Sequence, residues 1–449
     1  MNAQTLVEYF SGLHYEQVPE DAMQETKRMV LDTLGCIVSA RGTEAGRIAE
    51  RFAGLLGGAS GIAGSAYVYG RLADAMDFNE GYGGAHFGCG AVAAALALAR
   101  EPGITGKEFL TAVAAGYELG GRIQDAMGPY YSVVDGRQSF SPVWGIATPI
   151  VYAAVGAAAR ALRLDHALTA QAWGLAGSNS PIPVGAKWSS SIDLPNTKYC
   201  DAGWCSLAGV TGALSAQFGS TGITTLLDDP GGLLRMVSSL HPAHALLFAG
   251  LGTRWRIRDV VYKTWPCCGL LDEPMDDLLS LMQEQPFDVE TIERIEVEVG
   301  SAIVIPRFVN TDPRTFASLQ FNLPHALAML LLKVPPGPEW LSADLARDPR
   351  VAALRAKVIV REHRDPWPAP GQRKPSSVRV ITKNGDRPRF SGNRGQTSKR
   401  WGDDEIVDKF RSLVAPDDDR SIIDTVMSLE TLDSPAPLLD ALQRAKPRH

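Results

Sequence analysis

Residues 21–40 read DAMQETKRMVLDTLGCIVSA and predict one long helix. Pro19 lies just ahead of this run, at a position where the start of a helix tolerates proline. The apolar side chains recur at helical spacing along one face: Met23, Met29, Val30, Leu34, Ile37 and Val38. The stretch therefore predicts a helix that packs into a core.

More helices follow along the first half of the chain. The tetrad 105–108, TGKE, is a capping box before the apolar-periodic run 109–123. Ala- and Val-rich periodic segments recur at 149–164, 167–175 and 203–218. Residues 1–257 are therefore predicted to be almost wholly helical. Because several of these helices have little polar face, they indicate a large bundle or an oligomer interface.

The pattern changes after about residue 258. Residues 292–299, IERIEVEV, alternate apolar and charged side chains, which is typical of a half-buried strand. Segments 357–361 and 378–383 repeat this signal, and the second ends on Asn384-Gly385, a hairpin turn pair. A helix is predicted between them at 323–332, the Pro-rich stretch 366–375 is predicted to be a loop, and helical spacing returns at 404–413 and 437–444.

These segments together predict a mainly α fold. We expect a large all-helical domain formed by both chain ends, residues 1–257 completed by 404–449. A smaller α+β domain, residues 258–403, would be inserted between them. A chain of 449 residues is long enough for one large and one smaller core.

Composition excludes several classes of function. Hydrophobic residues make up 45%, charged residues 21%, and the net charge is -6, with no Lys/Arg stripe of the kind that binds nucleic acid. The longest apolar run, 91–99, is too short to span a bilayer. The six cysteines form no Cys-x-x-Cys pair and no secretory signal is visible, so we expect reduced thiols in a soluble cytoplasmic protein.

No familiar cofactor motif is present. The sequence contains no Gly-x-Gly-x-x-Gly after a strand, no Walker loop and no His-Glu-x-x-His. The adjacent pair Cys267 and Cys268 is a poor metal site, because neighbouring thiolates do not fit ordinary tetrahedral geometry. We therefore predict an enzyme without a metal or an organic cofactor.

The first polar cluster that could carry chemistry is residues 77–86, DFNEGYGGAH. Asp77 and His86 are a plausible base and acid pair, and the glycines let the backbone approach a ligand closely. The competing interpretation is a helix end with capping groups and a histidine satisfied in the core.

Two lysines lie in further polar segments. Lys198 precedes Asp201 in 196–203, NTKYCDAG, and such a lysine can hold a carboxylate. Taken alone, it is more simply a surface lysine paired with Asp201. Lys263 lies in 262–268, YKTWPCC, and also suits an anionic substrate.

These segments, in order, resemble the MmgE/PrpD family of 2-methylcitrate dehydratases, cis-aconitate decarboxylases and iminodisuccinate epimerases. The resemblance runs through 27–35 (KRMVLDTLG), 75–86 (AMDFNEGYGGAH), 173–178 (WGLAGS), 198–203 (KYCDAG) and 263–268 (KTWPCC). It implies a helical domain plus a smaller α/β domain, an active site between them and a homodimer. By resemblance, the catalytic residues are Asp77, His86, Lys198 and Lys263, and the substrate-binding residues are Tyr82, Ser141, Asp201, Cys268, Asp272 and His325.

The departures from the family pattern concern the substrate. Ser141 and Asp201 stand where the family has histidines, Asp272 replaces the His of a Thr-His pair, and His325 replaces a Tyr. An extra buried carboxylate near an anionic substrate costs several kcal/mol unless it is neutralised. The changes favour a substrate with fewer carboxylates, or one with an amine that Asp201 or Asp272 could bind.

The resemblance implies removal of a proton next to a carboxylate of a small organic acid. Asp77 or His86 would be the base, with burial raising the pKa of a carboxylate base, and Lys198 and Lys263 would hold the acid. Loss of water gives a dehydratase, the first hypothesis. The second is an epimerase of an amino- or imino-dicarboxylate, and the third is a catalytically silent helical scaffold.

Overall fold

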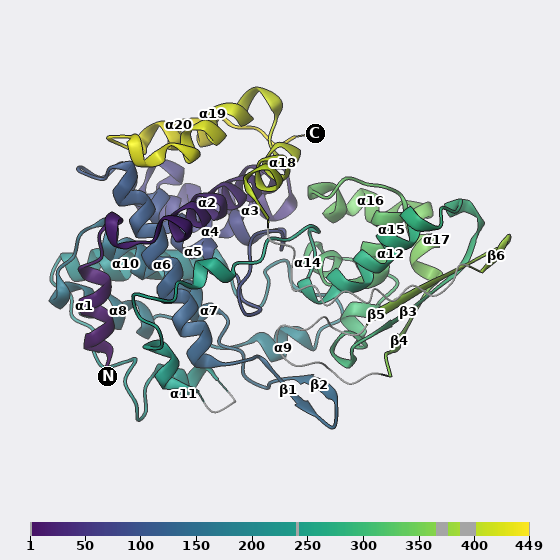
Figure 1. Cartoon of the computed structure of the whole chain (residues 1–449), viewed down its shortest axis with the longest axis horizontal. Coiled ribbons are helices and arrows are strands. Elements are labelled where there is room, and N and C mark those ends of the chain that lie inside the picture. Colours follow the sequence, from purple (N-terminus) through teal and green to yellow (C-terminus); the bar gives the residue numbers. More distant parts are fainter. Residues whose placement is uncertain (1, 239–241, 365–375, 387–400, 449) are drawn as a thin grey trace.

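The computed structural model describes residues 2–238, 242–364, 376–386 and 401–448. It shows a large body of helices beside a smaller body that contains a sheet (Figure 1). The predicted fold class is therefore confirmed. The predicted loop 366–375 lies outside the described residues.

The helical body is built around α5, α6, α7 and α10, which pack against one another and are flanked by α2, α4 and α8. Every residue of α5 and α7 is buried, because both are Ala-rich and lack a polar face. The elements of this part are α1 (Ala3–Ser11), α2 (Glu20–Ala40), α3 (Glu44–Leu55), α4 (Ile62–Asp74), α5 (Gly88–Leu98), α6 (Gly106–Met127), β1 (Tyr131–Val134), β2 (Arg137–Phe140), α7 (Ala147–Ala161), α8 (His166–Ser178), α9 (Gly185–Ser189), α10 (Ala202–Gln217) and α11 (Leu233–Val237).

The smaller body contains a mixed sheet with the strand order β4-β3-β5-β6. β3 pairs in parallel with β4 and antiparallel with β5, and α15 and α17 pack together before the chain enters β4. The elements are α12 (Asp272–Glu284), β3 (Ile292–Val299), α13 (Pro306–Val309), α14 (Phe316–Gln320), α15 (Leu323–Leu331), α16 (Ala343–Arg347), α17 (Pro349–Ala356), β4 (Val358–Glu362), β5 (Ser376–Thr382) and β6 (Gly385–Asp386). All three predicted strands are present.

The C-terminal segment returns to the helical body. α18 (Asp403–Leu413) and α19 (Pro416–Met427) pack against α2, and α20 (Ala436–Arg444) packs on α19. Figure 1 shows these helices, in yellow, above α2 and far from the sheet. The two chain ends thus meet in one body, while the boundaries at 257 and 404 stay a prediction.

The expectation of an almost wholly helical first half is wrong in several stretches: the described residues between α8 and α10 and those after α10 are mostly irregular, and one segment is a hairpin. β1 and β2 form an antiparallel hairpin whose turn residues Asp135 and Gly136 have φ of 51° and 76°. An Asp-Gly pair accepts such positive φ angles in a two-residue hairpin turn. The signal was present in VVDGRQ, but the segment is only four residues on each side.

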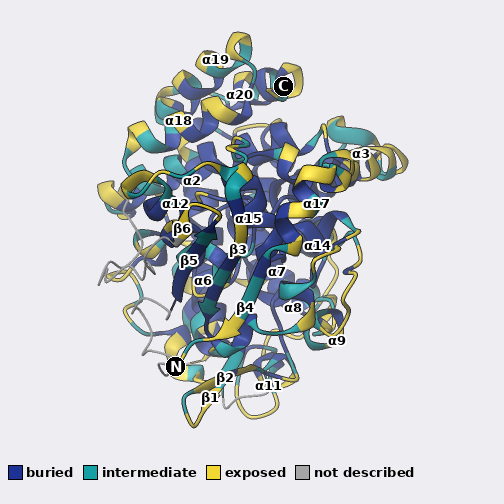
Figure 2. Ribbon diagram, turned by 90° about the vertical axis from the view of Figure 1, so that its right-hand side faces the viewer, coloured by how far each residue is buried: buried dark blue, intermediate teal, exposed yellow. Residues whose placement is uncertain are grey.

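Buried residues run through the centre of both bodies, and exposed stretches are concentrated on peripheral helices such as α3 and α19 (Figure 2). In the described ranges, every helix is too short or too polar to cross a bilayer. All six cysteines are free thiols.

Candidate active site

The centre of the candidate site is the carboxylate of Asp77, just after α4. Asp77 has a φ of 52°, a left-handed conformation that Asp tolerates better than most residues. Its backbone N–H still donates to the carbonyl of Asp74 at 3.3 Å. The turn leaves both carboxylates buried, with Asp74 and Asp77 each 1% exposed.

Two buried lysines meet these carboxylates. Nζ of Lys198 donates to Asp74 Oδ1 at 2.7 Å and lies 2.6 Å from Asp77 Oδ1. Nζ of Lys263 donates to Asp77 Oδ2 at 2.7 Å. The two lysines and the two aspartates form a balanced set of buried charges, which is the condition under which such burial is tolerated.

Backbone pairing places Lys263. Gly81 and Val261 exchange two hydrogen bonds, of 2.8 and 2.9 Å, which tie the 77–86 segment to the residues before Lys263. The ammonium also donates to the carbonyls of Asp77 at 2.8 Å and Cys267 at 3.0 Å. Its three N–H groups therefore have three acceptors, and Lys263 has no donor left for a substrate.

Lys198 is placed by a loop held from both sides. Arg71 donates to the carbonyl of Asn196 at 2.8 Å, and the Trp188 indole donates to that of Thr197 at 3.1 Å. The interpretation of Lys198 as a surface lysine paired with Asp201 is wrong, because its side chain is 1% exposed and its partners are Asp74 and Asp77. Two carboxylate oxygens occupy at most two of its three N–H groups.

His86 completes the cluster. Its Nδ1 lies 2.6 Å from the carbonyl of Glu80, and its Nε2 lies 3.5 Å from Asp77 Oδ1. Since a carbonyl only accepts, Nδ1 carries the proton and Nε2 keeps its lone pair in the neutral ring. Burial lowers the pKa of His86 to about 3, and the charges of Lys198 and Lys263 act in the same direction. The ring is therefore neutral at neutral pH.

The same lysines reverse the expectation for Asp77. Burial alone would raise the pKa of its carboxyl, but the charges of Lys198 and Lys263 outweigh burial and hold the pKa well below its ordinary value. An aspartate with a raised pKa was expected, and that expectation is wrong. Asp77 is a stable anion and a weak base, and His86 is the better proton acceptor.

A second buried ion pair supports the segment from the C-terminal end of the chain. Lys409, on α18, lies 2.7 Å from Asp32 Oδ1 and donates to the carbonyl of Phe78 at 2.7 Å. The other oxygen of Asp32 accepts from the backbone N–H of Glu80 at 3.0 Å. The backbone between Asp77 and His86 is thus held by helices from both chain ends.

Two predicted substrate-binding residues, Tyr82 and Asp201, have other partners, and a third, Ser141, has none for its side chain in the described ranges. The Tyr82 hydroxyl donates to Asp125 at 2.9 Å. Asp201 caps α10 through the N–H of Gly203 at 2.9 Å and also meets Tyr67 at 3.4 Å and Arg71 at 3.8 Å. Ser141 is buried, and its Oγ has no hydrogen-bond partner among the described residues.

The other three lie on the side of the smaller body. The backbone of Cys268 donates to the carbonyl of Gln320 at 2.8 Å, in the loop that carries Lys263. Asp272 is the first residue of α12. His325 lies inside the smaller body, where its Nε2 meets the carbonyl of Trp340 at 2.6 Å, so the structure does not bring it to the Asp77 cluster.

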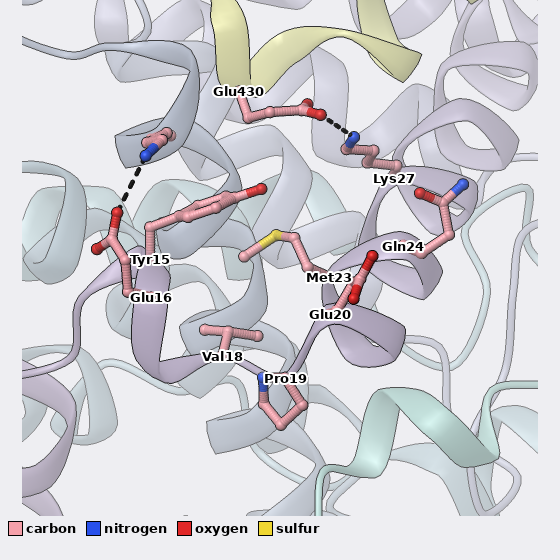
Figure 3. Close-up of a pocket in the computed structure, with 10 residues that line it drawn as sticks. Tyr15, Glu16, Val18, Pro19, Glu20, Met23, Gln24, Lys27 and Glu430 are labelled. Atoms are coloured by element: carbon pink, nitrogen blue, oxygen red, sulfur yellow. Dashed lines mark hydrogen bonds and ion pairs between the residues drawn. The ribbon is translucent and has the colours of Figure 1, made fainter.

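One cavity lies outside this cluster, and a second borders it at Lys263. One, of about 540 Å³, lies at the start of α2, and its lysines are already paired, Lys27 with Glu430 and Lys107 with Glu16 (Figure 3). The other, of about 260 Å³, is lined by Lys263, Lys409 and the acidic face of α18. In the described ranges, no group of three His, Cys, Asp or Glu side chains is arranged to hold a metal ion.

Comparison with known families decides the assignment. Residues 4–245 match the MmgE/PrpD N-terminal domain, and residues 265–431 match the MmgE/PrpD C-terminal domain. The chain belongs to the MmgE/PrpD family. Members of the MmgE/PrpD family are typically enzymes, dehydratases and related, and membership supports a dehydratase-like lyase at this coarse level. No curated protein matched the chain.

Sequence reasoning missed the partners of the two lysines. Asp74 is the last residue of α4 and lies only three residues before Asp77, so a second carboxylate near Asp77 was visible in the sequence. Asp32 and Lys409 could not be paired from sequence, because 377 positions separate them. Arg307 interrupts the apolar run IVIPRFV, and a lone charge in such a run was an available signal.

Proposed function

We propose that this MmgE/PrpD protein is a cofactor-free hydro-lyase that removes a proton next to a carboxylate of a small organic acid. The observation that carries the proposal is the neutral imidazole of His86. Its Nδ1–H is held by the carbonyl of Glu80, so Nε2 is free to take a proton. A homodimer, as the resemblance implies, and a cytoplasmic location, as the cysteine pattern favours, are part of the same proposal.

The step follows from this geometry. Nε2 of His86 takes the proton from the carbon next to the carboxylate, and the electron pair forms a carbon–carbon double bond as the bond to the β-hydroxyl breaks. The leaving hydroxyl takes up the proton that Nε2 has accepted, so that water departs and the ring of His86 is neutral again. Asp77, 3.5 Å from Nε2, stabilises the imidazolium that forms. The remaining N–H of Lys198 stabilises the charge that develops on the substrate carboxylate.

The epimerase hypothesis has lost part of its support. It rested on Asp201 and Asp272 as partners for an amine, but Asp201 is bonded to the start of α10 and to Arg71. Return of a proton to the opposite face also needs a second acid or base there. The described cluster offers His86 on one side of Asp77 and two protonated lysines on the others.

Incubation with a panel of small hydroxy and amino acids in deuterium oxide tests the proposal. We expect an alkene product, with deuterium incorporation into recovered substrate, and we expect His86→Gln to abolish both. His325→Gln is the matched control, since it changes a buried histidine outside the cluster. Exchange without net product would favour the epimerase, and no exchange with any acid would favour the silent scaffold.

A further inference from the structure

The guanidinium of Arg307 is a buried cation without a carboxylate partner among the described residues. Arg307 is 3% exposed, and NH1 donates to the carbonyl of Ser189 at 2.9 Å. Its Nε is buried and has no hydrogen-bond partner in the described chain. Among the other buried arginines, Arg71, Arg122, Arg160 and Arg256 each have a carboxylate within 4.0 Å, whereas Arg355, inside the smaller body, also has a buried Nε without a partner in the described chain.

Aromatic rings surround this cation. The guanidinium carbon lies 4.5 Å from the ring centre of Phe308, 5.1 Å from Phe140, 5.6 Å from Trp188 and 6.0 Å from Trp144. Ring faces stabilise a cation without neutralising it, so the positive charge remains available to an anion. Burial lowers the pKa of Arg307 to about 10, which still leaves it charged at neutral pH.

Arg307 lies where the two halves of the chain meet. It belongs to α13 of the smaller body, whereas Phe140, Trp188 and Ser189 belong to the helical half. Figure 1 shows α9, which carries Trp188 and Ser189, between the helical body and the sheet. The Asp77 cluster joins the same two halves through Lys263.

One chain of ring contacts and one shared electrostatic neighbour relate Arg307 to that cluster. Trp188 packs against Tyr199 with ring centres 5.4 Å apart, and Nζ of Lys198 lies 5.3 Å from the Tyr199 ring. On the other side is Cys268: burial raises the pKa of its thiol, and the charges of Asp77, Lys263 and Arg307 also act on it. The guanidinium is therefore one ring pair away from Lys198 and acts on the same thiol as Asp77 and Lys263, but it does not belong to their ion pairs.

The charges around the Asp77 cluster determine which group of the cluster or its surroundings can bind a further carboxylate. Asp74 and Asp77 balance the charges of Lys198 and Lys263, and Lys263 has no free donor. We propose that Arg307 is the specificity-determining residue of the site and binds a second carboxylate of the substrate, remote from the carbon that loses its proton. A guanidinium with an unused edge suits a carboxylate because it offers parallel N–H donors. This inference rests on the proposed function and deepens it, because it makes the substrate a dicarboxylate.

Binding of matched acids to the purified protein tests the inference. The probes are malonate, succinate, glutarate and adipate, each beside its monocarboxylate: propionate, butyrate, valerate and hexanoate. We expect at least one dicarboxylate to bind about tenfold or more tighter than its partner, a typical loss when one charged hydrogen-bonded group is removed. Titration calorimetry gives both dissociation constants.

The decisive variant is Arg307→Met, which keeps an unbranched side chain inside the aromatic cage and removes the charge. We expect it to lose the preference for the dicarboxylate while the monocarboxylate binds as before. Arg355→Met is the matched control, since Arg355 is also 3% exposed and donates to a backbone carbonyl, that of Ala346, at 2.8 Å. Arg307→Lys should keep part of the preference.

The inference is overturned if wild-type protein shows no preference in any pair, or if Arg307→Met retains the preference. A lower melting temperature of Arg307→Met with unchanged relative affinities would assign Arg307 to packing alone. His86→Gln separates the two proposals. The His86→Gln variant should keep the preference for dicarboxylates although it exchanges no deuterium. A failed hydro-lyase assay would therefore not affect the interpretation of the binding result.

Discussion

Replacement of Glu80 by Gln is expected to stabilise the protein, and more so at high pH. Glu80 is fully buried, and burial together with the charge of Asp32 raises its pKa to about 8. Its Oε1 accepts from the Gly88 N–H at 2.8 Å, and its Oε2 is 3.4 Å from the Tyr117 hydroxyl. A glutamine amide can keep both contacts, because the hydroxyl can turn and accept from the amide N–H.

The magnitude follows from proton linkage. The carboxyl has a pKa of about 8 in the folded protein, against a value of 4.5 without the protein environment. The folded state therefore holds this proton more tightly, so wild-type stability falls as pH rises from about 4.5 to about 8. Between about pH 5.5 and about pH 8.5 the loss is about 3 kcal/mol for a single independent group.

Urea unfolding at these two pH values measures the effect. The gain of Glu80→Gln over wild type should be larger at the higher pH by about 3 kcal/mol. Glu293→Gln, at an exposed position of β3, is the control and should show no such change. An equal effect of Glu80→Gln at both pH values would mean that Glu80 is already ionised in the folded protein, and the argument from burial would be refuted.

Three further predictions follow from the same contacts. Lys409→Met leaves Asp32 as an unpaired buried carboxylate, which should cost about 3–5 kcal/mol in urea unfolding, and Asp32→Asn in the same chain should recover part of that loss. Gly106→Ala should lower the melting temperature, because its Cβ would overlap the carbonyl oxygen of Leu429 and both groups are backbone-fixed; an unchanged melting temperature would mean that the C-terminal segment shifts freely. The pKa of His86 is lowered to about 3, so kcat/KM for proton removal should stay level from about pH 8 down to about pH 5, and a fall centred near 6.5 would show an unshifted imidazole.

The elements of the fold were predictable where periodicity is strong. Residues 21–40 are α2 (Glu20–Ala40), and the alternating run 292–299 is β3, because one-sided burial leaves a direct trace in sequence. The β1–β2 hairpin was missed since its strands are short and partly exposed. The parallel pairing of β3 with β4 also left no local trace, because the partners lie far apart in the chain.

The sequence was sufficient to predict which residues lie in the candidate site, but not the chemical role of each. Local polarity and the family resemblance pointed to Asp77, His86, Lys198 and Lys263, and the structure brings these four together. The protonation states depend on distances that no local pattern contains. Two lysines within 2.7 Å hold Asp77 as an anion, and for this reason we propose His86, rather than Asp77, as the base.

The proposed role of Arg307 offers an explanation for one departure from the family pattern, the serine at position 141. By the family resemblance, Ser141 stands at a histidine position, and it follows Phe140, whose ring centre lies 5.1 Å from the guanidinium carbon of Arg307. A histidine at 141 would offer one or two donors in this region, whereas the guanidinium has five, one of them donated to Ser189, and is charged at neutral pH. A site that relies on Arg307 would bind its second carboxylate with little dependence on pH, while a site that relies on histidine would lose that carboxylate above neutral pH. If Arg307 binds the second carboxylate in place of a histidine, the affinity of the wild-type protein for the preferred dicarboxylate should stay constant between about pH 6 and about pH 8, with Ser141 unchanged.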